Sequence, residues 1–294
     1  MNAPKIALLD AGRWSDYALL DTGNGKKLEK FGPYRFVRPE PQALWTPRLD
    51  ERQWAQADGV FVSGDDEDAG KWRLRDGVEE RWIMEYRGLR FWAHCTPFRH
   101  LGFFPEQAVQ WDWIEDKIAG ARSPVRVINL FGYTGVASLI AARAGADVTH
   151  LDSSKKALTY TRENQEAAGL EGKTIRFICD DAMKFMARAA RRDQKYDAII
   201  VDPPKFGRGA KGEVWKLFDD LPELLKLCRE ALSDKPLFVV LTTYAIRASS
   251  LAVRYALEHA MSDLGGHVEG GEMVTREADT QRLLSLAHFS RWSR

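Results

Sequence analysis

The clearest indication of the fold comes from Val125-Arg-Val-Ile-Asn-Leu-Phe-Gly-Tyr-Thr-Gly135. Its first six residues form a short apolar run that predicts a buried strand over 125–130. An alanine-rich segment with helical composition, 136–145, follows. Between them Gly132 and Gly135 indicate a tight turn of the kind that joins a strand to a helix. The stretch therefore predicts the first strand, turn and helix of a doubly wound sheet.

Strand-like runs and longer helix-like runs alternate after this stretch. The predicted strands are 148–151, 175–178, 196–201 and 237–242, and the predicted helices are 155–169, a run ending at Arg192, and about 214–232. This alternation specifies a mostly parallel sheet covered on both faces. Two last runs, 267–274 and 283–289, lie close together around turn-forming residues, which favours an antiparallel pair at the sheet edge. We expect an α/β fold with a doubly wound, seven-stranded, mostly parallel sheet.

The first part of the chain has a different sequence pattern. Short aromatic runs at 17–20, 34–37, 82–86 and 89–92, separated by Gly, Pro and Asp, predict strands and hairpins. Eight of the ten tryptophans lie in the first 113 residues, where core packing is a better interpretation than a base-stacking platform. We predict a small β-rich domain over 1–110 and an α/β domain over 111–294. The acidic run 65–68 predicts an exposed loop.

Composition excludes several classes of protein. With 43 basic and 42 acidic residues, no global field draws the chain to polyanions, so a nucleic-acid partner is neither required nor excluded. Cys95, Cys179 and Cys228 lack metal or disulfide spacing, which predicts reduced thiols, structural and buried, and no metal site. No secretory or membrane-spanning segment is evident, so we expect a cytoplasmic protein with no membrane partner.

Three motifs at successive strand ends describe a cofactor site. The Gly132-x-x-Gly135 spacing departs from the GxGxxG of dinucleotide sites, which weakens an NAD interpretation. Asp152 ends the second strand, where a carboxylate can accept both hydroxyls of a ribose. Asp181 ends the third, where an acid can accept an adenine amine while Ala182 leaves room for the ring. Each acid has an alternative role as a helix cap. Together the motifs predict an adenosine pocket without phosphates.

The fourth strand ends in Asp202-Pro-Pro-Lys-Phe206. Prolines fix φ and donate no hydrogen bond, so Pro203 and Pro204 predict a rigid turn whose carbonyls face the site. With Asp202 these oxygens form an acceptor cluster suited to an amine or ring N–H and to the positive charge of methyl transfer. Phe206 is placed to stack on a base. The alternative is a structural Pro-Pro turn in which Asp202 is a cap.

These motifs, with Gly102-Phe-Phe-Pro-Glu-Gln107, resemble those of class I S-adenosylmethionine-dependent methyltransferases. More narrowly, the chain resembles the bacterial family that methylates 23S ribosomal RNA at cytosine C5 or guanine N7. The resemblance implies a Rossmann-like methyltransferase fold, S-adenosylmethionine as cofactor and S-adenosylhomocysteine as product. It implies cofactor-binding residues Phe104, Gln107, Asn129, Leu130, Phe131, Gly132, Thr134, Gly135, Asp152, Ser153, Asp181, Ala182 and Asp202. It implies acceptor-site residues Asp202, Pro203, Pro204, Lys205 and Phe206.

Two features depart from that family. Many of its members begin with an RNA-binding PUA module, whereas we expect the first residues here to form a small β-rich domain that covers the site instead. Methylation at pyrimidine C5 needs a cysteine thiolate near the fourth or fifth strand end, but Lys205 and Thr242-Thr243-Tyr244 stand there. We therefore favour direct transfer to a base nitrogen of ribosomal RNA.

The acceptor is the open part of this interpretation. Four basic residues follow the Pro-Pro motif and suit RNA phosphates as well as a solvated loop: Lys205, Arg208, Lys211 and Lys216. A protein or small-molecule acceptor is the first alternative, and a cofactor-binding module without catalysis is the second. A homo-oligomer is also compatible with the tryptophan-rich region.

Overall fold

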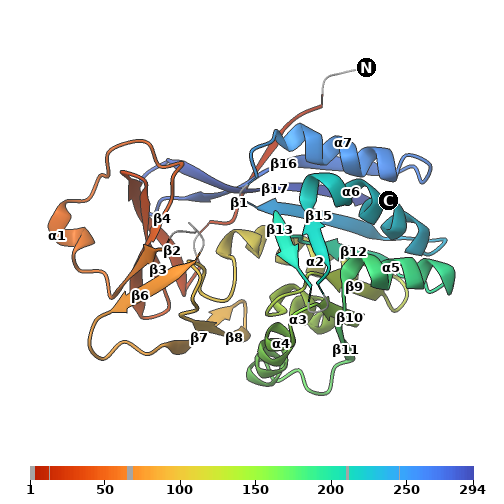
Figure 1. Cartoon of the computed structure of the whole chain (residues 1–294), viewed down its shortest axis with the longest axis horizontal. Coiled ribbons are helices and arrows are strands. Elements are labelled where there is room, and N and C mark those ends of the chain that lie inside the picture. Colours follow the sequence, from red (N-terminus) through yellow and green to blue (C-terminus); the bar gives the residue numbers. More distant parts are fainter. Residues whose placement is uncertain (1–3, 13, 65–68, 210–211, 245) are drawn as a thin grey trace. The chain divides into compact units, whose positions relative to one another are not determined.

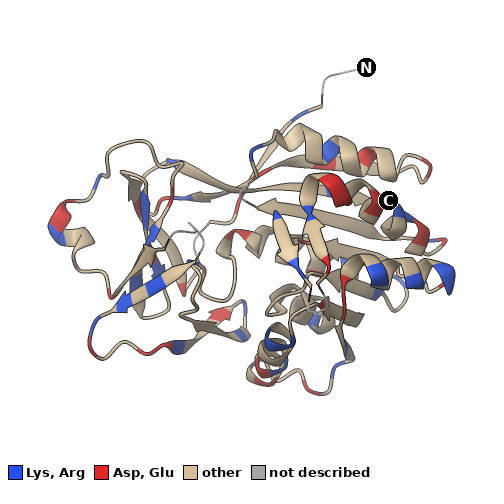
Figure 2. Ribbon diagram, in the orientation of Figure 1, with Lys and Arg blue, Asp and Glu red and all other residues tan. Residues whose placement is uncertain are grey.

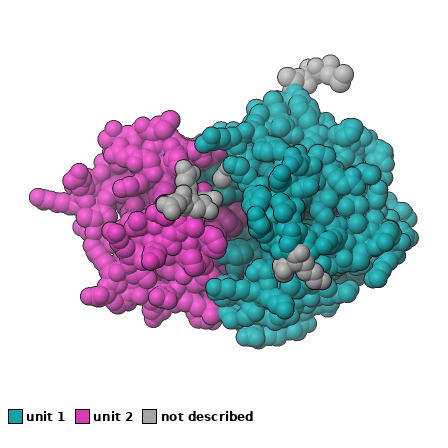
Figure 3. All heavy atoms as spheres, viewed as in Figure 1, with its two compact units in different colours: residues 1–9, 109–273, 286–294 teal, residues 10–108, 274–285 magenta. Residues whose placement is uncertain are grey.

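The computed structural model describes residues 4–12, 14–64, 69–209, 212–244 and 246–294. The chain forms two compact units, coloured separately in Figure 3. Unit 1 comprises residues 1–9, 109–273 and 286–294, and unit 2 comprises residues 10–108 and 274–285. The expected contiguous domains, 1–110 and 111–294, differ from these units because both chain ends contribute to unit 1 and a C-terminal segment belongs to unit 2. The predicted acidic loop and Lys211 lie outside the described residues.

A large sheet runs through unit 1 (Figure 1). Its strand order is β1 (Ala7–Asp10), β16 (His267–Arg276), β17 (Leu283–Ser293), β15 (Phe238–Tyr244), β12 (Ala198–Val201), β9 (Arg126–Leu130), β10 (Asp147–Asp152) and β11 (Ile175–Cys179). The strands from β15 to β11 pair in parallel, whereas β17 pairs antiparallel with β15. The predicted doubly wound, mostly parallel sheet is confirmed.

The sheet has one strand more than the seven we expected. β1 adds to the edge beside β16, so the β16–β17 pair is not itself the edge. The backbone of Ala7 lies so close to Gly271 that a Cβ there would meet the Ala7 carbonyl oxygen at 1.9 Å. The four-residue β1 is too short to carry a periodic signal, and it is defined by this close pairing.

Helices cover both faces of the sheet. They are α2 (Ala108–Ala119), α3 (Val136–Arg143), α4 (Lys155–Ala167), α5 (Ala182–Arg191), α6 (Leu217–Ala231) and α7 (Ser250–Ala260). Along β9, Ile128 and Leu130 pack in a core with α5, α6 and α7, while Val127 packs in a second core with α2 and α3. Successive strand residues thus feed opposite apolar layers, which is why these strands read as continuous apolar runs.

The region after β12 corrects one expectation. The predicted helix over 214–232 begins at Leu217, because Val214–Lys216 forms strand β14. This strand pairs antiparallel with β13 (Phe206–Arg208). The Trp215 indole N–H donates to the Pro204 carbonyl at 2.7 Å, which fixes the hairpin to the proline turn. Helices α2 and α7 were not predicted from the sequence.

Unit 2 is β-rich, as predicted. It holds a five-stranded sheet of β2 (Tyr17–Gly23), β3 (Lys26–Phe31), β4 (Tyr34–Pro39), β5 (Gly59–Ser63) and β6 (Gly70–Leu74), the hairpin β7 (Arg81–Tyr86) and β8 (Leu89–His94), and the short helices α1 (Glu51–Trp54) and η1 (Pro105–Gln107). Asn24 and Gly25 have φ of 50° and 71°, as a two-residue hairpin turn requires. Aromatic side chains, among them the fully buried Phe31, Phe36 and Phe91, fill its core.

None of the helices in the described ranges is long and apolar enough to cross a membrane. Within the same ranges, no group of three or more His, Cys, Asp or Glu side chains is arranged to hold a metal ion.

Candidate active site

The carboxyl ends of four parallel strands meet at one edge of the sheet. Leu130 of β9 is in register with Leu151 of β10 and with Val201 of β12. Asp152, the last residue of β10, is in register with Cys179, the last residue of β11. Because the predicted motifs directly follow these ends, the sheet brings them to the same edge, where open α/β sheets bind ligands.

A pocket opens at this edge. Six of the residues predicted for the site line it: Phe131, Asp152, Ser153, Asp181, Ala182 and Pro204. Six further residues line it that were not predicted to bind the cofactor: Leu151, Asp180, Gly207, Arg208, Gly209 and Trp215. Of these, Arg208 had been considered from the sequence, as a residue suited to RNA phosphates. The sequence signal for the second group was weak, because four of them come from the β13–β14 hairpin and its connection, where we expected a loop and a helix.

The other predicted residues do not line this pocket. Asn129, Leu130, Gly132, Thr134 and Gly135 belong to the strand and turn behind it, and Asp202, Pro203, Lys205 and Phe206 flank it. Phe104 and Gln107 belong to unit 2. Their part in the cofactor site stays a prediction.

The turn after β9 has an unusual backbone. Phe131 and Tyr133 adopt left-handed φ angles of 56° and 49°, and Gly135 has φ of 85°. For a residue with a side chain this conformation costs on the order of 1 kcal/mol or more. The Gly132 N–H donates to the Leu151 carbonyl at 2.9 Å, and the Tyr133 N–H donates to Asp152 Oδ2 at 2.9 Å. Neighbouring β10 thus holds the turn in this strained form.

Asp152 has the properties expected of a ribose-binding acid. Oδ2 accepts from Tyr133 N–H, and Oδ1 accepts from Ser154 N–H at 2.8 Å. Each carboxylate oxygen has two lone pairs, so both can still accept a hydroxyl. Burial raises the pKa of Asp152, and the two N–H bonds oppose that rise. The alternative helix-cap role falls to Ser154, whose side chain accepts from Ala157 N–H.

The two aspartates that follow β11 already have hydrogen-bond or ion-pair partners. Asp181 caps α5, with Oδ1 accepting from Lys184 N–H at 2.9 Å. Asp180 accepts from Asp181 N–H and forms an ion pair with Arg188. The cap interpretation of Asp181 is therefore confirmed. Because both carboxylates also line the pocket, their remaining lone pairs can receive an amine.

A chain of buried hydrogen bonds, which was not predicted from the sequence, supports the turn. The Asn129 amide donates to Ser138 Oγ at 2.9 Å, and Ser138 Oγ lies 2.9 Å from His150 Nδ1. His150 Nε2 lies 3.1 Å from Thr161 Oγ1, which donates to the Tyr133 carbonyl at 2.8 Å. We call Asn129, Ser138, His150 and Thr161 the sub-turn chain.

The hydrogen bonds of the sub-turn chain determine the tautomer of His150, and its burial keeps the ring neutral. Since Ser138 receives the Asn129 amide, its own hydroxyl hydrogen is available for Nδ1, and Nε2 then carries the ring hydrogen. Burial lowers the pKa of His150 to about 4, so the ring is neutral near pH 7. The signal in the sequence was a single polar residue inside the apolar run 148–151, which we interpreted only as a strand.

The two glycines of the turn pack against this chain. A Cβ at Gly132 would meet His150 Cε1 at 2.3 Å, and one at Gly135 would meet Thr161 Cγ2 at 2.1 Å. We expected these glycines for the tight turn. The structure adds a second reason, because the space that a Cβ would occupy at each position is taken by side chains of β10 and α4.

The proline segment is tied to its surroundings. The Asp202 N–H donates to the Leu130 carbonyl at 3.4 Å, which places the start of the segment beside the strained turn. The Pro204 carbonyl accepts from the Trp215 indole, and the Lys205 carbonyl accepts from Leu217 N–H at 3.1 Å. The expected ring of free carbonyls is thus reduced, because the Pro204 oxygen already has a donor. Phe206 is 52 % exposed beside the pocket residue Gly207.

The cysteines depart in part from expectation. Cys228 is buried, and burial raises its pKa to about 12. Cys95, in unit 2, also has a pKa raised to about 12 by burial and by the nearby Glu80. Cys179 was expected to be buried, but it is exposed at the end of the edge strand β11, where its thiol donates to the Ser153 carbonyl at 3.6 Å.

Fold and pocket together define the class: a doubly wound α/β protein with an acidic pocket at the carboxyl edge of its sheet. A family model described as S-adenosylmethionine-dependent methyltransferase matches residues 53–254. The chain belongs to this family. The pocket fits the cofactor, because its carboxylates can accept hydroxyl and amine hydrogens and its apolar residues can contact a ring.

Solved and curated relatives agree with this assignment. The crystal structure of a SAM-dependent methyltransferase from Agrobacterium tumefaciens is 48 % identical, covers 99 % of this chain and 96 % of its own, and has a TM-score of 0.94. Ribosomal RNA large subunit methyltransferase K/L of Shewanella frigidimarina is 34 % identical over 53 % of this chain and 22 % of its own length. Ribosomal RNA large subunit methyltransferase I of Aeromonas salmonicida is 24 % identical over 70 % of this chain and 54 % of its own. The chain thus spans about half or less of these curated relatives.

Proposed function

We propose that this protein transfers a methyl group from S-adenosylmethionine to a base nitrogen of ribosomal RNA in the cytoplasm. The observation that carries the proposal is that Asp152, Asp181 and Pro204 line one pocket. This joins the predicted ribose acid, adenine acid and acceptor motif in a single site. The names of the curated relatives support RNA as the acceptor.

In this proposal Asp152 accepts the ribose hydroxyls, and Asp180 or Asp181 accepts the adenine amine. The cofactor supplies an electrophilic sulfonium methyl. The acceptor nitrogen would form a bond to the methyl carbon as the carbon–sulfur bond breaks. S-adenosylhomocysteine would leave with the electron pair of that bond, and the nitrogen would release its proton to solvent. Asp202 orients the acceptor through the N–H and stabilises its positive charge. Positioning of this kind can contribute roughly 7 to 11 kcal/mol.

The exposed face of Phe206 suits a flipped or single-stranded base. The ring is 52 % exposed, and the Arg208 guanidinium lies 5.9 Å from its centroid. A base stacked on an aromatic ring gains about 1 to 3 kcal/mol. Arg208 also lines the pocket, so the hairpin offers both an exposed aromatic face and a cation at this edge of the sheet.

The cysteines support nitrogen over carbon C5 as the target. Cys228 is buried in the core of unit 1 and its thiol has a raised pKa, which disfavours a thiolate nucleophile. The Cys179 thiol donates a hydrogen bond to the carbonyl of Ser153, next to the proposed ribose acid Asp152. The Asp202–Phe206 segment contains no cysteine.

Labelled S-adenosylmethionine, incubated with ribosomes from a strain lacking this protein, tests the acceptor. Label in ribosomal RNA that digestion assigns to a methylated base nitrogen is the expected result. Label in protein or in a small molecule would replace RNA as the acceptor, and absence of label from all fractions would indicate a binding module without catalysis.

Asp202→Asn should lower turnover about 100-fold, because the amide keeps the shape of the carboxylate but removes the charge that stabilises the acceptor. The affinity for S-adenosylhomocysteine, measured by isothermal titration, should change less than twofold. Asp234→Asn, at an exposed position before β15, is the matched control. Full activity of Asp202→Asn on labelled ribosomal RNA would contradict the assigned role.

A further inference from the structure

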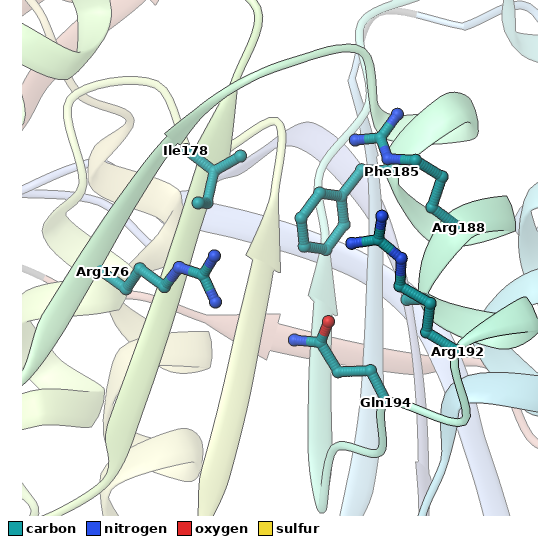
Figure 4. A pocket seen from close by; sticks show the side chains of 7 residues that line it. Arg176, Ile178, Phe185, Arg188, Arg192 and Gln194 are labelled. Atoms are coloured by element: carbon teal, nitrogen blue, oxygen red, sulfur yellow. The ribbon is translucent and has the colours of Figure 1, made fainter.

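A second cavity of unit 1 lies between the edge strand β11 and helix α5. Its lining residues are Arg176, Ile178, Phe185, Arg188, Ala189, Arg192 and Gln194. Figure 4 shows Arg176 and Arg192 extending toward the same space from opposite sides, with the Phe185 ring and the Gln194 amide between them. None of the cofactor-pocket residues lines this cavity.

The cavity carries uncompensated positive charge. Its lining residues, all of them described, include no acidic side chain. Arg188 is neutralised by its ion pair with Asp180. Among the described residues, neither Arg176 nor Arg192 has an acidic partner within ion-pair distance. Two guanidinium groups are therefore free to receive an anion.

Strand and helix periodicity explain why these side chains converge. On β11, Arg176 and Ile178 face α5, while the intervening Phe177 faces away and lies 4.8 Å from the guanidinium of Arg162. On the α5 side, Phe185, Arg188 and Arg192 are spaced by three and four residues, which places them on one face.

Helix stabilisation alone does not account for this cluster. The carboxyl end of a helix attracts cations, and α5 ends in several arginines, seen as a blue cluster in Figure 2. Arg191 fits that explanation, since it is exposed and does not line the cavity. Arg176 does not, because it comes from the neighbouring strand. Gln194 is also held in place, with its amide donating to the Tyr196 hydroxyl at 2.6 Å.

We propose that this cavity binds a phosphate group, and that the phosphate belongs to the backbone of the acceptor RNA. The planar guanidinium matches phosphate oxygens in a two-bond geometry, and arginines commonly position a nucleic-acid strand through such contacts. Asp180 lines the cofactor pocket and pairs with Arg188 of this cavity, so the two sites are adjacent. The identification of the strand rests on the proposed function, whereas phosphate binding does not.

The test compares the double variant Arg176→Gln/Arg192→Gln with the matched control Arg191→Gln. The affinity for a fluorescein-labelled single-stranded RNA is measured by fluorescence anisotropy at several salt concentrations from about 50 to about 200 mM. Loss of one phosphate contact should reduce the slope of log K against log salt by about 0.7 in the double variant and leave the control unchanged. Unchanged affinity for S-adenosylhomocysteine establishes that the double variant is folded. Inorganic phosphate should raise the melting temperature of the wild type but not of the double variant.

The outcomes separate this proposal from the proposed function. If the double variant and Arg191→Gln reduce the slope of log K against log salt equally, RNA is attracted by the overall positive charge of this surface. That result would overturn the proposed phosphate site. If the double variant binds and methylates RNA with the wild-type slope, the cavity is overturned while the methyltransferase proposal stands. If phosphate stabilises the wild type through these arginines but RNA does not bind, the RNA source is overturned and a small phosphate ligand replaces it.

Discussion

At the scale of single residues, Asp152 both shapes the pocket and faces it. Its carboxylate holds Tyr133 and Ser154 by their backbone N–H groups, and burial raises its pKa. The raised pKa means that the charged form is lost at a higher pH than for an ordinary aspartate. Cofactor binding that needs this charge should therefore weaken on acidification before exposed aspartates titrate.

Asp152→Ala should raise the Kd for S-adenosylmethionine about 30-fold, equivalent to about 2 kcal/mol, because a charged acceptor and a support of the strained turn are lost together. Isothermal titration measures this effect. Asp147→Ala, at the exposed opposite end of β10, is the control and should bind as the wild type does. A Kd for Asp152→Ala within twofold of the wild type would exclude it from the site.

At the scale of elements, the sub-turn chain connects β9, α3, β10 and α4 beneath the cofactor turn. Its central residue, His150, is fully buried and neutral, with a pKa lowered to about 4. The unfolded chain binds a proton near the ordinary histidine pKa of about 6.5. Between these values the unfolded state binds more protons than the native state, so native stability falls as the pH falls.

Wild-type protein should therefore lose up to about 3 kcal/mol of unfolding free energy through His150 as the pH drops from about 6.5 toward 4, and none above that range. Urea unfolding at several pH values measures the loss. His150→Gln should be less stable at neutral pH but should show a shallower acid dependence. His267→Gln, an exposed histidine, should follow the wild type. Parallel curves for His150→Gln and the wild type would refute this assignment.

At the scale of the whole molecule, the C-terminal part of the chain completes unit 2. Residues 274–285 belong to that unit, where the Ala278 N–H donates to the Leu19 carbonyl at 2.8 Å. Glu277 is 1 % exposed and accepts from Thr22 Oγ1. Asp279 forms an exposed ion pair with Arg48. Folding of the first strands of unit 2 thus depends on residues about 250 positions away.

Glu277→Ala in the full chain should destabilise unit 2 by about 3 kcal/mol, because it leaves buried donors without an acceptor. Hydrogen exchange should accelerate in β2 and β3 and remain at the wild-type rate in β9 and β12. Asp279→Ala removes a neighbouring exposed carboxylate and should change stability by less than about 1 kcal/mol. Equal effects of the two substitutions would show that the C-terminal segment is not integral to unit 2.

Local sequence patterns were sufficient to predict the parallel sheet, the order of its motifs and the class of cofactor. The apolar run 125–130 and the acids Asp152 and Asp181 mark the ends of strands, and parallel pairing brings those ends to one edge. The surroundings of these residues, in contrast, depend on contacts between distant segments. The pairing of β1 with Gly271, the contact of Trp215 with Pro204, the sub-turn chain and the convergence of Arg176 with Arg192 each join residues from different elements. Local periodicity does not predict such contacts, because they form and stabilise the protein only when distant segments have packed together.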